Sequence, residues 1–188
     1  MNALPRFEGL RVIVAGDPIA DRYLRAEPAR LSREAPVMVL RHLSEELRAG
    51  GAANTARNLR ALGCEVELIG AVGRDATGRE LVRALEDEGI DGSGVLLVEG
   101  RVTPTKTRVL AAEARRHPQQ VLRIDREPTA ELEQGVRARI AARLAERAGA
   151  ADAVLLSDYG YGALDVEVAD VARAAAREGR IVTLDPRR

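Results

Sequence analysis

The stretch "AGGAANTARNL", residues 49–59, places two glycines ahead of a helical pattern of small residues. Gly50 and Gly51 leave backbone N–H groups uncovered at the start of a helix, and Asn54, one turn further on, offers both a donor and an acceptor. Larger side chains would stabilise a helix better, so something must come close to this backbone. Two interpretations remain open: a hydroxylated, uncharged ligand, or alanines that let the helix lie close on a sheet.

Around this helix start, strand and helix patterns alternate along the chain. Short apolar runs predict strands, and the helical spacing of apolar residues predicts helices. The expected strands are 11–16, 66–72, 95–98, 153–156 and 181–184, and the expected helices are 52–62, 77–88, 131–147 and 166–178. The alternation predicts an α/β fold with a largely parallel sheet.

Two stretches, residues 22–42 and 101–125, interrupt this alternation. In the second, "TPTKTRVL" and "QQVLRID" resemble strands with no helix between them. We expect the two stretches to pair as a small separate sheet. The sequence has no repeat or linker that would divide it, so one domain over residues 1–188 is expected.

The composition excludes several classes of partner. Hydrophobic residues make up 46% of the 188 residues and aromatic ones 2%, while Lys+Arg and Asp+Glu both number 29. This balance favours neither nucleic acid nor a membrane surface. A single cysteine, Cys64, and no apolar run of spanning length point to the cytoplasm. His42 and His117 are too few and too far apart to suggest a metal site.

Carboxylates follow two of the predicted strands. Asp17 and Asp21 lie in "AGDPIADRY", and Asp158 lies in "LLSDYGYG". Ligands of parallel sheets bind beyond the carboxyl ends of the strands, and carboxylates accept hydrogen bonds from sugar hydroxyls. The alternatives are a turn at Asp17, with Asp21 capping the next element, and a turn at Asp158.

Two cations alternate in "TPTKTRVL". Lys106 and Arg108 should project from one face of a strand, about 6 to 7 Å apart. Two such cations repel each other unless an anion lies between them, and a phosphate bridges such a pair well. The alternative is an edge strand whose charges prevent association of sheets.

In order and spacing, these motifs resemble the ribokinase-like (PfkB) family of sugar kinases over essentially the whole chain. The matching segments are "GDPIADRY", "GGAANTARNLRALG", "VGRDATGRELVRALEDEGI", "TPTKTRVL", "LLSDYGYGAL" and "TLDP". Within the family, "TKTRVL" followed by "QQVLRIDRE" is most similar to the D-glycero-β-D-manno-heptose-7-phosphate kinases, including the kinase half of bifunctional heptose enzymes. The resemblance implies a three-layer ribokinase-like fold with a small β-lid, and phosphorylation of the sugar phosphate at its anomeric position, toward ADP-heptose for lipopolysaccharide.

The resemblance also implies roles for individual residues. The sugar would lie against Gly50 and Gly51, with Asn54 and Asp21 on its hydroxyls. The stretches 22–42 and 101–125 would form the lid, which closes over the sugar and often supplies a dimer contact. The implied substrate-binding residues are Asp17, Asp21, Gly50, Gly51, Asn54, Lys106, Arg108 and Asp158.

On the nucleotide side, the resemblance implies ATP and Mg²⁺ in the complete enzyme, with Asp185 and Arg187 as nucleotide-binding residues. Tyr161 and Arg187 stand where the heptose enzymes tend to have Lys. The family's Gly-Ala-Gly-Asp stretch, which carries the catalytic Asp, would follow Arg188, so this segment alone is expected to be inactive. Another PfkB sugar kinase and a non-catalytic sugar-phosphate-binding module are the alternatives.

Overall fold

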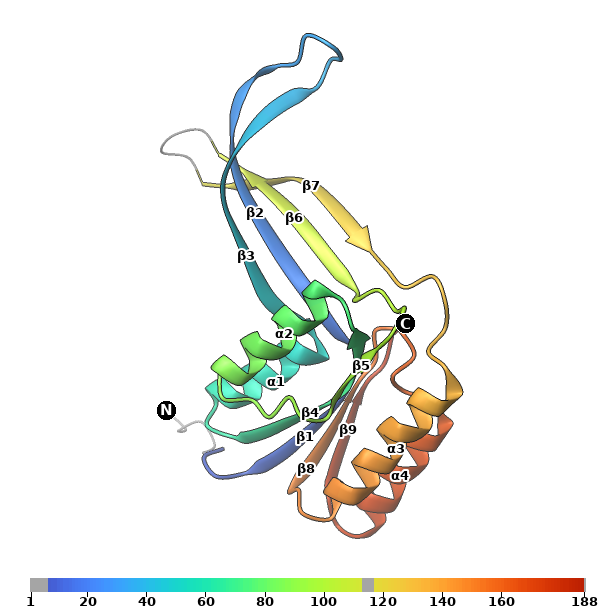
Figure 1. Ribbon diagram of the computed structural model, residues 1–188. Coiled ribbons are helices and arrows are strands. Elements are labelled where there is room, and N and C mark those ends of the chain that lie inside the picture. Colours follow the sequence, from blue (N-terminus) through green and yellow to red (C-terminus); the bar gives the residue numbers. More distant parts are fainter. Residues whose placement is uncertain (1–6, 113–116, 188) are drawn as a thin grey trace.

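The computed structural model describes residues 7–112 and 117–187, and a central sheet lies between its helices (Figure 1). Among these residues, five parallel strands form this sheet in the order β5-β4-β1-β8-β9. Each lies within one residue of the predicted bounds at either end. The strands are β1 (Arg11–Gly16), β4 (Glu65–Gly73), β5 (Val95–Val98), β8 (Ala153–Ser157) and β9 (Ile181–Asp185).

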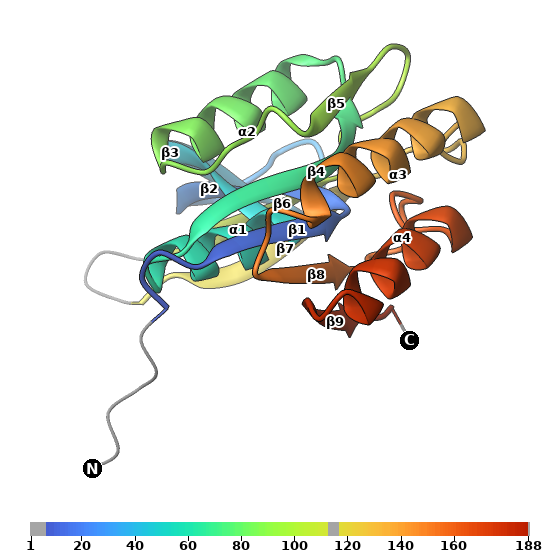
Figure 2. The same ribbon diagram turned by 90° about the horizontal axis from the view of Figure 1, so that it is seen from below.

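Helices cover both faces of this sheet, as Figure 2 shows from below. They are α1 (Ala52–Ala61) and α2 (Ala76–Asp87) on one face, and α3 (Gln134–Ala148) and α4 (Val166–Arg177) on the other. In β1, Val12 and Val14 belong to the core under α1 and α2, whereas Ile13 and Ala15 belong to the core under α3 and α4. Burial on both faces is typical of a parallel sheet between helices, which confirms the predicted three-layer fold. Within the described residues, no helix is long and apolar enough to span a membrane.

A second sheet, the lid, stands beyond the carboxyl ends of the central strands (Figure 1). Its strands are β2 (Pro18–Leu31), β3 (Met38–Gly51), β6 (Thr105–Ala111) and β7 (Gln119–Arg126). They are ordered β3-β2-β6-β7, with β2 and β6 parallel and the other pairs antiparallel. The predicted pairing of the two irregular stretches is therefore confirmed. The bounds expected for the first, 22–42, were too narrow, because β2 begins directly after Asp17 and β3 continues to Gly51.

The chain crosses between the central sheet and the lid at several points. It passes from β1 into β2 at Asp17 and from β3 into α1 at Gly51. The remaining crossings are residues 99–104, between β5 and β6, and residues 127–133, between β7 and α3. These crossings gather the polar residues of the sequence motifs at the base of the lid.

Candidate functional site

The two glycines of "AGGAAN" are needed because other groups lie against their backbone. A Cβ atom on Gly50 would lie 2.7 Å from Oδ2 of Asp21, and one on Gly51 would lie 2.5 Å from the carbonyl oxygen of Asp17. Gly51 also has a φ of 57°, which favours glycine. The alanines that follow are fully buried, so the close-packing interpretation holds for them. In contrast, Gly50 makes room for the Asp21 carboxylate, and Gly51 makes room for the Asp17 carbonyl, at the base of the lid.

Asn54 lies on the first turn of α1 and is exposed. Within the described residues, its amide forms no hydrogen bond, and α1 begins at Gly51 without a side-chain cap. The Ala52 N–H already donates to the Asp17 carbonyl at 3.1 Å, so the exposed Asn54 amide is the group here that can receive hydroxyl groups. The sequence-based assignment of Asn54 to a ligand is compatible with this geometry and stays a prediction.

Asp21 lies inside strand β2, so the alternative that it caps a following element is wrong. Its carboxylate forms an ion pair with Arg108 on β6, with 2.5 Å between Oδ1 and Nη1, and about four fifths of each side chain is buried. The ring of Tyr23 lies between two guanidinium groups, 5.3 Å from Arg48 and 5.5 Å from Arg108. Arg108 is therefore held in place by one carboxylate and one aromatic ring.

Lys106 and Arg108 lie on one face of β6, as the alternation predicted. β6 is an inner strand of the lid, between β2 and β7, so the edge-strand explanation of the two cations is wrong. The argument from unbalanced repulsion also needs correction, because Asp21 neutralises Arg108. Lys106 forms no ion pair within the part of the chain that the structure describes, and its Nζ lies 5.6 Å from the centre of the Tyr159 ring.

Across the lid, Asp125 on β7 is the register partner of Lys106. Its carboxylate accepts two hydrogen bonds from Arg123, at 2.7 and 2.5 Å. The Arg123 hydrogen bond, helped by the charges of Arg123, Lys106 and Arg108, lowers the pKa of Asp125. The face therefore mixes both signs of charge.

Asp17 has a different place from the one predicted. Asp17 is 2% exposed, and its carboxylate accepts hydrogen bonds from the backbone N–H groups of Tyr159, Tyr161 and Ala163. These bonds occupy the oxygens that were expected to receive sugar hydroxyls. Asp17 thus supports a loop rather than facing a substrate, which corrects its assignment among the substrate-binding residues.

The remaining predicted residues gather around the same loop. The carboxylate of Asp158 accepts a hydrogen bond from the Gly160 N–H at 2.8 Å, so the turn interpretation describes its local geometry. The Asp158 N–H donates to the Asp185 carbonyl at the end of β9. Arg187 donates to the Tyr159 carbonyl at 3.1 Å. The structure brings Asp158, Asp185 and Arg187 together, and their contacts with ligands stay predictions.

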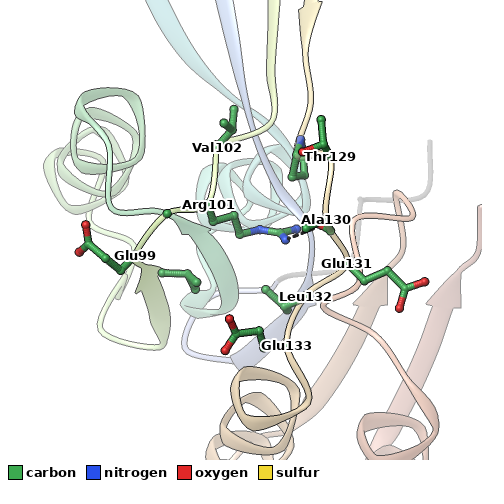
Figure 3. Close-up of a pocket in the computed structure, with 11 residues that line it drawn as sticks. Glu99, Arg101, Val102, Thr129, Ala130, Glu131, Leu132 and Glu133 are labelled. Atoms are coloured by element: carbon green, nitrogen blue, oxygen red, sulfur yellow. Dashed lines mark hydrogen bonds between the residues drawn. The ribbon is translucent and has the colours of Figure 1, made fainter.

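Sequence reasoning missed Arg101, which spans the crossings at 99–104 and 127–133. Figure 3 shows its side chain reaching across a cavity of about 120 Å³ to the Ala130 carbonyl, and it also donates to the Tyr161 carbonyl at 2.6 Å. Burial lowers the pKa of Arg101, although the charge of Asp17 opposes this. Ligand pockets are usually about 300 to 1,000 Å³, so this cavity is too small for a sugar phosphate. None of the predicted substrate-binding residues lines this cavity.

Sequence comparison gives a family match over almost the whole chain. Residues 12–187 match the model of the pfkB family carbohydrate kinases. The "Bifunctional protein HldE" of Helicobacter pylori (strain J99) is 39% identical over 94% of this chain and 37% of its own length. The protein of the same name from Geobacter metallireducens is 41% identical over 95% of this chain and 36% of its own. The chain thus spans little more than a third of the length of these relatives.

Solved structures share the fold at lower identity. Phosphofructokinase-2 from Escherichia coli, in complex with fructose-6-phosphate, superposes with a TM-score of 0.65 at 21% identity, over 95% of this chain and 55% of that one. A carbohydrate kinase from Agrobacterium tumefaciens gives a TM-score of 0.61 at 24% identity, over 93% and 53%. At these identities the likeness establishes the fold.

Proposed function

Because the chain belongs to the pfkB family of carbohydrate kinases, we propose that it forms the sugar-binding part of a heptose-phosphate kinase. The reaction would transfer the γ-phosphoryl group of ATP to the anomeric hydroxyl of D-glycero-β-D-manno-heptose 7-phosphate, toward ADP-heptose for lipopolysaccharide. The relatives named HldE and the segments "TKTRVL" and "QQVLRIDRE" support this substrate over the other sugars of the family.

The observation that carries the proposal is the Asp21 carboxylate, held directly over the bare backbone of Gly50. Arg108 fixes one oxygen of this carboxylate, and the exposed amide of Asn54 lies on the neighbouring helix start. A sugar needs acceptors and donors for its hydroxyl groups, and this carboxylate and this amide supply both. They lie beyond the carboxyl end of β1, where ligands of parallel sheets bind.

The 7-phosphate would be recognised by the lid. Lys106, which forms no ion pair within the described residues, supplies a charge that a phosphate can neutralise. Arg108 already shares one nitrogen with Asp21, so it would offer the phosphate its remaining N–H groups. We therefore assign Lys106 the larger part in telling phosphorylated from unphosphorylated sugars.

ATP and Mg²⁺ are the expected donor and its metal. Arg187 exposes a guanidinium group, which suits polyphosphate oxygens, and Asp185 is exposed beside it at the end of β9. These residues fit the nucleotide side of the site, and we assign the metal no ligand among them. The metal would supply neutralisation of charge on the transferred phosphoryl group.

The test is a comparison of sugars in the full-length protein. ADP release is measured with heptose 7-phosphate, the same heptose without phosphate, ribose and fructose 6-phosphate. The proposal predicts a kcat/KM for heptose 7-phosphate at least about tenfold above the others, as one charge-assisted hydrogen bond provides. Preference for another sugar would favour a different pfkB kinase, and tight binding without turnover would favour a sugar-phosphate-binding module.

We also propose that two copies associate through their lids. β7 is an edge strand of the lid, and its Val121, Leu122 and Ile124 side chains are each more than half exposed. A run of exposed apolar side chains along an edge strand is a surface that a second copy can cover. Ile124→Lys should shift the full-length protein from dimer to monomer in light scattering, and a monomeric wild-type protein would contradict the idea.

A further inference from the structure

The loop between β8 and α4 is organised around a carboxylate from the far end of the sequence. Oδ2 of Asp17 accepts the N–H groups of Tyr159 and Tyr161, both at 3.0 Å, and Oδ1 accepts that of Ala163 at 2.9 Å. Asp17 lies more than 140 residues away and is 2% exposed. Three backbone donors of the loop are thus satisfied by a single side chain.

The sequence "YGYGA", residues 159–163, is suited to hold such a carboxylate. Every second residue donates, and the two residues between the donors, Gly160 and Gly162, have φ angles of 76° and 94°. These left-handed φ angles turn the chain at each glycine, and the N–H groups of Tyr159, Tyr161 and Ala163 all donate to the same carboxylate. Side chains with a Cβ rarely adopt these φ angles, so both glycines are needed.

Within the described residues, no Lys or Arg forms an ion pair with Asp17. The charge of Asp17 instead acts on Arg101, whose guanidinium donates to the Tyr161 carbonyl. The bonds from the loop are therefore charge-assisted bonds to an otherwise unpaired carboxylate, which makes them the strong kind. Removal of the charge would release the loop.

The same loop contacts both the lid side and the nucleotide side of the candidate site. The Tyr159 ring lies under Lys106 of the lid, and the Tyr161 hydroxyl donates to Glu127, just after β7, at 2.6 Å. On the nucleotide side, the Tyr159 carbonyl accepts from Arg187. A shift of this loop would move groups on both sides of the site together.

We propose that Asp17 is a positioning residue of the kinase, which holds the loop 158–163 in the geometry that aligns the lid with the nucleotide side. This inference rests on the proposed function, and it assigns Asp17 no contact with either substrate. It also accounts for a buried acid at the carboxyl end of β1, a position from which a substrate-facing side chain would be expected to be accessible.

The test compares Asp17→Asn with a matched control, Asp75→Asn, in the full-length protein. Asp75 also accepts hydrogen bonds from several donors, those of Gly78 and Thr103, but at the start of α2. Hydrogen exchange of the amides of residues 159–163 should quicken by about tenfold or more in Asp17→Asn, as loss of a charge-assisted bond predicts. In Asp75→Asn the exchange of these amides should quicken no more than that of other core amides, because that variant loses hydrogen bonds at the start of α2 and not in the loop.

Kinetics give the second readout. A misplaced loop should lower kcat/KM in Asp17→Asn by about 10- to 100-fold, both for the sugar and for ATP. The control Asp75→Asn should lose much less. Gly162→Ala, which disturbs the loop and leaves Asp17 intact, should show the same pattern, and the double variant should add little. If exchange is unchanged, or if the loss falls on the KM of the sugar alone, Asp17 does not position the loop.

Failure of this inference can be told apart from failure of the proposed function. If the wild-type protein phosphorylates a different sugar, the kinetic comparison is made with that sugar and the inference stands or falls on the same results. If the wild-type protein phosphorylates none, the proposed function and the positioning role both fail, while hydrogen exchange still reports whether Asp17 holds the loop.

Discussion

Neutralising Lys106 and neutralising Arg108 should have different consequences, although the two residues are neighbours on β6. Lys106 has no ion pair within the described residues, whereas Arg108 holds the carboxylate of Asp21. Lys106→Met should therefore weaken binding of the phosphorylated sugar and leave binding of the unphosphorylated sugar unchanged. Arg108→Met should weaken it too, and should also leave Asp21 without its partner in the hydroxyl-binding part of the site.

The sizes of these effects follow from the contacts. A charge-assisted hydrogen bond to phosphate contributes about 1.5 to 3 kcal/mol, so Lys106→Met should raise KM for heptose 7-phosphate by about 10- to 150-fold. About four fifths of the Asp21 and Arg108 side chains is buried, so breaking their pair costs more than an exposed ion pair and less than a fully buried one. We place this cost at about 2 kcal/mol, or about 30-fold, for either sugar.

The assay measures kcat and KM of the full-length protein with the heptose and its 7-phosphate. Arg41→Met is the matched control, because Arg41 pairs with Glu27 on the distal part of the lid and should leave both sugars unaffected. An equal loss for the two sugars in Lys106→Met would refute the phosphate assignment. If the two variants changed the ratio of kcat/KM for the 7-phosphate to kcat/KM for the unphosphorylated heptose by the same factor, the Asp21–Arg108 pair would have no role in hydroxyl binding.

Further predictions concern the start of α1, the Asp75 cap of α2 and the edge strand β9. Asn54→Ala should lower kcat/KM by about 5- to 150-fold, because it loses hydrogen bonds of about 1 to 3 kcal/mol to the sugar. Asn58, four residues further on, is also exposed, and Asn58→Ala should leave kcat/KM unchanged. Equal effects of the two variants in steady-state assays would argue against a sugar contact at Asn54. Burial alone would raise the pKa of Asp75, but hydrogen bonds from Thr103 and Gly78 outweigh it, and the pKa is lowered in the folded protein. The ionised carboxylate therefore stabilises the fold above the ordinary pKa of 3.8, and this stabilisation is lost as the pH falls through the lower folded pKa. Asp75→Asn should then be less stable than wild type by about 1 to 3 kcal/mol at pH 7, with a gap that narrows below about pH 4 in urea unfolding; a gap independent of pH would contradict the lowered pKa. Ile181 and Leu184 are exposed on the edge strand β9, so the 188-residue chain alone should self-associate, and Ile181→Lys should reduce this in light scattering; a monodisperse wild-type monomer would contradict it.

The central sheet could be predicted from sequence because its strands are short apolar runs bounded by turn residues. The lid could be predicted to exist, but its extent could not. Pro18 suggested a turn after β1, yet a proline can begin a strand, where its missing N–H is not required. Gly50 and Gly51 suggested the start of a helix, and they also form the end of β3. Local residue preferences do not distinguish these uses.

The candidate site was predictable where one segment supplies the signal. Gly50, Gly51 and Asn54 belong to one motif, and the structure keeps them together at the base of the lid. The occupied carboxylate of Asp17 and the bond from Arg101 to Tyr161 join residues 60 or more positions apart. The residues next to Asp17 in the sequence do not reveal that its carboxylate is buried and hydrogen-bonded by such a distant loop.

The most direct test of the account follows the product by ³¹P NMR. Full-length protein is incubated with ATP, Mg²⁺ and D-glycero-β-D-manno-heptose 7-phosphate, and the spectrum is compared with that of the Asp21→Asn variant. We predict a second phosphate ester on the sugar, coupled to the anomeric proton and formed in step with ADP, and a strongly reduced signal in the variant. Phosphorylation at another carbon, or ATP turnover that Asp21→Asn leaves unchanged, would contradict the account.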